Sequence, residues 1–126
     1  MAPRRDKITF DTVRRIGLAL SGVEEGTSWG SPALKIGGQM FACIPTHRSA
    51  EPDSLVVRIS FEQRDELIEA DPRTFYLKEH YVGYPCVLVR LSRIHPDTLR
   101  DLLQMGWRYV SERTRRRATP RKRKAR

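Results

Sequence analysis

The sequence is poor in the features that mark a secreted or membrane-embedded protein. It has two cysteines in 126 residues, too few for a disulfide scaffold and without the paired spacing of a zinc site. Cys43 and Cys86 each lie in an apolar, strand-like stretch, so we expect two buried, reduced thiols. No run approaches the roughly 20 apolar residues of a membrane span, and the N-terminus has no apolar signal core. These absences predict a cytoplasmic protein.

Catalytic and metal-ligand motifs are also missing. The three histidines, His47, His80 and His95, are spread over a polar loop, an aromatic loop and a helix entrance, so we predict no metal site and no cofactor. A nucleophile that pairs either cysteine with His80 is disfavoured, because an apolar strand would raise the pKa of the thiol. We therefore predict that the protein is not an enzyme. A reaction centred on the aromatic loop 78–85 is the weaker alternative.

Apolar periodicity and turn signals predict one α+β domain over residues 1–112. Helical spacing predicts helices over residues 10–20, 61–70 and 96–112. Alternating patterns predict strands over residues 33–36, 39–44, 55–59, 74–77 and 86–91. The order α-β-β-β-α-β-β-α is typical of a largely antiparallel sheet with helices packed on one face.

Three of these strands carry a cation at a position that alternation directs away from the helices. The cations are Lys35, Arg58 and Arg90. If the strands are neighbours, these side chains form a small basic row on the open face of the sheet. Nearby loops contribute Trp29, Tyr81 and Tyr84, a combination suited to phosphate contacts with base stacking. The alternative is an ordinary solvated sheet face whose cations have acidic neighbours.

The net charge of +9 belongs to the end of the chain. Residues 1–112 hold fifteen cations and all fifteen acids, whereas residues 113–126 hold nine cations and no acid. This tail has too few apolar residues to offset its ordering entropy, so we expect it to be disordered. Its cations are Arg113, Arg115, Arg116, Arg117, Arg121, Lys122, Arg123, Lys124 and Arg126.

Such a charge run binds polyanions by counterion release. Nucleic acid, most simply DNA, is the partner that this tail favours. An anionic membrane would also need an apolar anchor, and none is present, so we predict no membrane partner. The tail offers no geometry for reading bases, which predicts nonspecific binding.

Three separated segments resemble the MmcQ/YjbR family: TSWGSPALK at 27–35, GGQMFA at 37–42 and HYVGYPCVLV at 80–89. The resemblance covers roughly residues 8–112. It implies a fold like that of type III secretion chaperones, and a DNA-binding role through a double-wing arrangement, but no catalytic residues. The sequence has Gln39 where many members have Lys and Cys86 where many have Trp, which weakens a basic or aromatic contact at each position.

The leading hypothesis is therefore a non-enzymatic, nonspecific nucleic-acid-binding protein. In this hypothesis the tail supplies affinity and the open sheet face contributes a second contact. The alternative is a protein-binding module, since the resemblance extends to chaperones that dimerise and hold a client along a sheet or helix face.

Overall fold

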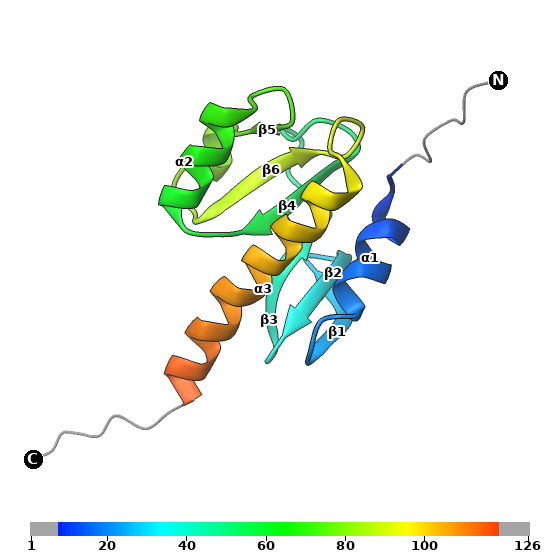
Figure 1. The fold of residues 1–126 in the computed structure, drawn as a ribbon, viewed down its shortest axis with the longest axis vertical. Coiled ribbons are helices and arrows are strands. Elements are labelled where there is room, and N and C mark those ends of the chain that lie inside the picture. The colour runs from blue at the N-terminus through cyan, green and yellow to red at the C-terminus, as the bar shows by residue number, and fades with distance from the viewer. Residues whose placement is uncertain (1–7, 119–126) are drawn as a thin grey trace, which may run out of the picture.

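The computed structural model of the chain describes residues 8–118, which form three α-helices, one short 3₁₀ helix and six strands (Figure 1). The helices are α1 (Phe10–Leu18), α2 (Phe61–Ala70), η1 (Glu79–Tyr81) and α3 (Pro96–Ala118). The strands are β1 (Val23–Ser28), β2 (Ser31–Ile36), β3 (Gln39–Cys43), β4 (Ser54–Arg58), β5 (Phe75–Tyr76) and β6 (Cys86–Arg90).

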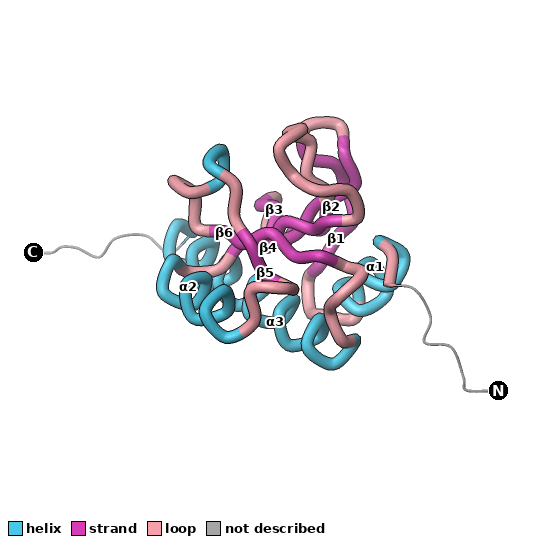
Figure 2. Tube along the Cα trace, turned by 90° about the horizontal axis from the view of Figure 1, so that it is seen from above, coloured by secondary structure: helices cyan, strands magenta, loops and turns pink. Residues whose placement is uncertain are grey.

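The strands form a single sheet in the order β1-β2-β3-β4-β6-β5, and every neighbouring pair is antiparallel. Figure 2 shows α1, α2 and α3 on one side of the sheet and several of the connecting loops on the other. The predicted α+β class, antiparallel sheet and one-sided helices are confirmed. Capping boxes at Thr9 and Ser60 begin α1 and α2 at the positions that the sequence predicts.

One strand was absent from the prediction. β1 pairs with β2 along its whole length, so four strands, rather than three, precede α2. Its sequence, VEEGTS, contains two adjacent glutamates and a glycine and lacks the apolar alternation of a strand with one buried face. As an edge strand, β1 buries little surface and is held mainly by its backbone pairing with β2.

The core lies between the sheet and α3, which crosses the sheet diagonally (Figure 1). Leu99, Leu102 and Leu103 are fully buried against it. One turn later, Gly106 allows the helix to approach β4 closely, because a Cβ there would lie 2.8 Å from a Val57 methyl carbon and 3.1 Å from the Arg58 carbonyl oxygen. The glycine therefore sets the distance between α3 and the centre of the sheet.

The predicted boundary of the tail is wrong by six residues. We expected disorder from residue 113, but α3 continues to Ala118. Thr114 packs against the β2–β3 turn, where a Cβ on Gly37 would lie 2.6 Å from the Thr114 methyl carbon. Arginine and alanine are good helix formers, so a helix already anchored by its leucines extends through them. Residues 119–126, with the last five cations, lie outside the described residues.

Although α3 is long, neither it nor any other helix within residues 8–118 is apolar enough to cross a bilayer.

We expect Leu102→Ala to lower the free energy of unfolding by about 2 to 5 kcal/mol, because it removes buried apolar surface and leaves a cavity. Gln104→Ala is the control, since Gln104 is exposed on the same helix and its replacement should have little effect. Urea denaturation of both variants measures the difference. Equal stabilities would contradict the assigned core.

Candidate functional site

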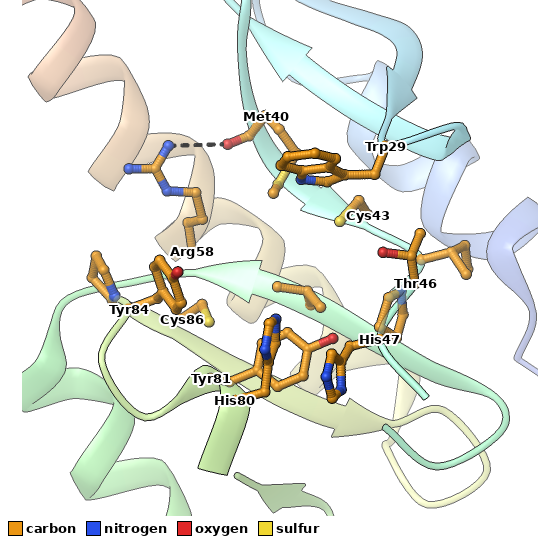
Figure 3. A pocket seen from close by; sticks show the side chains of 14 residues that line it. Trp29, Met40, Cys43, Thr46, His47, Arg58, His80, Tyr81, Tyr84 and Cys86 are labelled. Atoms are coloured by element: carbon orange, nitrogen blue, oxygen red, sulfur yellow. Dashed lines mark hydrogen bonds between the residues drawn. The ribbon is translucent and has the colours of Figure 1, made fainter. Parts of the chain in front are cut away.

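The open face of the sheet carries a hollow of about 690 Å³. Three connections surround it: the β1–β2 turn with Trp29, the β3–β4 loop with His47, and the η1 loop with His80 and Tyr84. Figure 3 shows Trp29 and Met40 on one side of the hollow and His80 and Tyr84 on the other. The three aromatic residues predicted for stacking, Trp29, Tyr81 and Tyr84, all line it.

The floor of the hollow is apolar, which differs from both expectations for this face. Cys43, Val56, Cys86 and Leu88 belong to a second buried cluster on the side away from the helices. β4 and β6 therefore bury apolar side chains on both faces along most of their length. Tyr76 and Tyr81 complete this cluster.

The structure does not bring the three predicted strand cations into one row. Arg58 pairs across the strands with Cys86, and Arg90 pairs with Ser54, so the two arginines occupy opposite ends of the β4–β6 ladder. Their Cα atoms are four strand positions apart, or roughly 13 Å along the strand. Lys35 lies on β2, opposite Glu24 of β1, which gives it an acidic neighbour.

Arg90 has a local role that keeps its charge occupied. Its guanidinium donates two hydrogen bonds of 2.7 Å to the Glu51 carboxylate and two more to the Pro72 and Arg73 carbonyls. The arginine holds the pKa of the Glu51 carboxyl below its ordinary value. Arg90 thus ties the β3–β4 loop to the segment before β5, and of the three cations it is the least available to a ligand.

Arg58 differs because no carboxylate within residues 8–118 pairs with it. The half-buried side chain donates a hydrogen bond of 3.4 Å to the Met40 carbonyl and lies over the Tyr109 ring at 5.7 Å. It lines the hollow on one side and, on the other, a small cleft shared with Arg113 of α3. An unneutralised guanidinium in this position can accept an anion.

Trp29 is the most exposed large apolar side chain among the described residues, with 89% of its surface accessible. It occupies the two-residue turn between β1 and β2, at a φ of 56°, followed by Gly30 at 80°. Tyr84, across the hollow, is 59% exposed. The site therefore presents two open aromatic rings above an apolar floor.

Two contacts that sequence reasoning missed hold the loops around the hollow. The His47 and His80 rings stack with centroids 3.8 Å apart and planes 12° from parallel, which joins the β3–β4 loop to η1. The buried Arg64 of α2 donates hydrogen bonds of 2.9 Å to the Val82 carbonyl and 3.1 Å to the Tyr84 carbonyl. Arg64 therefore fixes the backbone that positions Tyr84. No local sequence pattern predicts either contact, because each joins residues far apart in the sequence.

The cysteines form part of the floor but are poorly suited to catalysis. Both thiols are buried and unbridged, as the sequence predicts. Burial raises the pKa of each thiol to about 11. Within residues 8–118 no three His, Cys, Asp or Glu side chains converge as metal ligands. The apolar floor and the open aromatic rings suit the binding of a partly apolar group.

Comparison with known proteins adds a family match. A family model described as YjbR matches residues 18–109. Uncharacterized protein Rv2570 of Mycobacterium tuberculosis and uncharacterized protein Mb2600 of Mycobacterium bovis are each 29% identical over 115 residues, covering 79% of this chain and 85% of the relative. The crystal structure of Deinococcus radiodurans protein DR2400, a DUF419 domain, superposes with a TM-score of 0.68 at 22% identity, covering 84% of this chain and 80% of that one. That likeness supports the fold.

We expect both thiols to react slowly with a water-soluble alkylating reagent in the native protein. With a pKa raised by about two units, the thiolate fraction at neutral pH falls about 100-fold below that of an ordinary cysteine, and the rate should climb with pH toward 11. Mass spectrometry of timed samples measures the rate, and the denatured protein is the control. Rapid modification of either cysteine at pH 7 would contradict the burial.

We expect Arg64→Met to destabilise the fold by about 2 to 3 kcal/mol, because it removes two charged, part-buried hydrogen bonds that the buried guanidinium donates to the Val82 and Tyr84 carbonyls. Arg93→Met removes an exposed arginine and should have little effect. Thermal unfolding compares the two variants. If Arg64→Met is as stable as Arg93→Met, the arginine does not hold the η1 loop.

Proposed function

The chain belongs to the YjbR family, and from that premise we propose that it binds nucleic acid without catalysing a reaction, holding the phosphate backbone with the end of α3 and the residues beyond it. The observation that carries the proposal is that four of the nine cations of residues 113–126, at positions 113, 115, 116 and 117, lie on the end of α3, which extends past the sheet (Figure 1). Cations at residues 113–117 are spaced along this helix rather than distributed over a random coil.

Charge balance supports a polyanionic partner. The cations of residues 113–126 have no acidic residue among them, and the rest of the chain is already neutral. A few basic residues near a helix C-terminus stabilise the helix by interacting with its dipole, but that interaction does not account for nine cations. Phosphates release their counterions when such a cluster binds, which supplies affinity without base recognition. Nonspecific binding of DNA is the simplest form of this activity.

The open face supports a second contact with the same ligand. Arg58 and Arg113 both lie near the Tyr109 ring, at 5.7 and 5.5 Å, so the basic end of α3 continues to the rim of the hollow. Trp29 and Tyr84 line the same hollow as Arg58. Cations next to exposed aromatic rings are the combination that nucleic-acid-binding surfaces use for phosphates and bases.

A protein-binding module is the second candidate, and the apolar floor with the exposed Trp29 favours it. A protein partner would bury its own apolar side chain there. The two candidates differ in salt dependence. Binding through an apolar hollow changes little between 50 and 200 mM salt, whereas phosphate binding weakens steeply.

We expect the intact protein to bind a labelled 20-base-pair duplex with a slope of log K against log salt near −4.5, if about five cations contact phosphates, or roughly a 500-fold loss from 50 to 200 mM salt. Replacing the last five cations with glutamine should remove at least half of that slope and leave the thermal stability nearly unchanged. These residues are Arg121, Lys122, Arg123, Lys124 and Arg126. Fluorescence anisotropy measures the slope.

The control for this experiment is Arg93→Gln combined with Arg100→Gln. Both arginines are exposed: Arg93 precedes α3, and Arg100 lies in its second turn, roughly 20 Å or more from residues 113–117 at the helical rise of 1.5 Å per residue. The double variant should keep the slope of the parent protein. If the intact protein binds no duplex or single strand at low salt, the proposed function is wrong and the protein-binding candidate takes its place.

A further inference from the structure

We infer that the hollow on the open face holds one unstacked base of a single-stranded nucleic acid, with the neighbouring phosphate at Arg58. The inference rests on the proposed function and goes beyond it, because it assigns a preference for single strands over duplex to a defined set of side chains. Trp29, Tyr84 and Arg58 carry it.

The backbone of Trp29 is strained, and its side chain gains no packing that would offset the strain. Its φ of 56°, with Gly30 at 80°, is that of a primed two-residue turn, where asparagine and glycine are favoured at the first position. A bulky residue in this left-handed region is strained. Because the indole is 89% exposed, burial does not offset that strain. A strained, exposed aromatic ring at the mouth of a hollow indicates a binding role.

The hollow is large enough to admit a base, and its lining suits one chemically. Its volume of about 690 Å³ lies within the usual range for small-ligand sites. The floor is apolar, and the exposed rings of Trp29 and Tyr84 lie on opposite sides of the hollow (Figure 3). Thr46 and His47 add polar groups to the wall. A flat heterocycle with an apolar face and polar edges matches this lining.

The rim adds a site for phosphate. Arg58 is half-buried, and no carboxylate within residues 8–118 neutralises it. Its guanidinium lies between the hollow and the cleft that Arg113 lines. A strand whose base enters the hollow can therefore continue past Arg58 toward the cations of α3. This path gives the strand both a stacking contact and a line of positive charge.

A duplex cannot use the hollow in the same way. Its bases are paired and stacked within the helix, and extruding one costs a few kcal/mol. The phosphates of a duplex still reach the basic end of α3. Duplex binding should therefore depend on charge alone, while a single strand adds the contribution of the hollow.

The test uses a Trp107→Phe background, in which Trp29 is the one remaining tryptophan. Trp107 donates its indole N–H to the Ser21 carbonyl at 2.8 Å, well away from the hollow. Three probes of equal length are titrated at fixed salt: oligothymidine, a duplex, and an abasic single strand that has phosphates but no bases. We expect oligothymidine to quench Trp29 fluorescence, and the abasic strand and the duplex not to.

Affinity provides the second measurement. A stacked base contributes roughly 5- to 150-fold to the binding constant, so oligothymidine should bind more tightly than the abasic strand by a factor in this range. Trp29→Asn should remove that advantage and leave abasic binding unchanged. Because asparagine tolerates a positive φ, this variant should be at least as stable as the parent. Tyr84→Leu should weaken oligothymidine binding in the same direction, and Arg58→Gln should reduce the salt slope by about 0.7.

Leu18→Asn is the matched control, because it removes an exposed apolar side chain from α1 without touching the hollow. Equal affinity for oligothymidine and the abasic strand, with no effect of Trp29→Asn, would overturn the inference and leave the proposed function standing. Tight binding of thymidine monophosphate alone would assign the hollow to free nucleotides and also overturn it. A marked loss of stability in Trp29→Asn would show that the indole has a structural role, which would also overturn the inference. Failure of all three probes to bind at low salt would reject the proposed function itself.

Discussion

The close packing of α3 on β4 is the constraint on which the other features depend. Gly106 allows the helix axis to approach the sheet, and the leucines of the preceding turns anchor it there. This contact fixes the position of Tyr109, whose ring lies near both Arg58 and Arg113. It also places Thr114 against the β2–β3 turn, which keeps the following residues in the helix. The close packing at Gly106 therefore places the basic end of α3 next to the open face of the sheet.

Most of the fold could be predicted from local signals. Helical spacing located the three helices, and apolar patterns bounded by turn residues located five strands, because each of these elements buries apolar side chains at regular intervals. β1 was not predicted, because its two glutamates and its glycine leave the strand without an apolar face. The full length of α3 was not predicted for a different reason. The contact of Thr114 with Gly37 joins residues that are far apart in the sequence.

The candidate site was only partly predictable. Trp29, Tyr81 and Tyr84 were selected as unusual loop aromatics, and all three line the hollow. The apolar floor was missed although the sequence contained its signal, since β4 and β6 are nearly continuous apolar runs, typical of strands buried on both faces. The pairing of Arg90 with Glu51 and the stacking of His47 on His80 depend on tertiary structure and have no local signature.

The helical conformation of residues 113–118 matters for any ligand that spans the helix end and the hollow. A group bound at one of two surfaces held at a fixed separation meets the other at an effective concentration that can reach the millimolar range. A flexible connection would dilute this advantage as its length grew. Two weak sites joined by a helix can therefore act as a single stronger site, and breaking the helix between Tyr109 and Ala118 would separate them without changing a residue of the hollow.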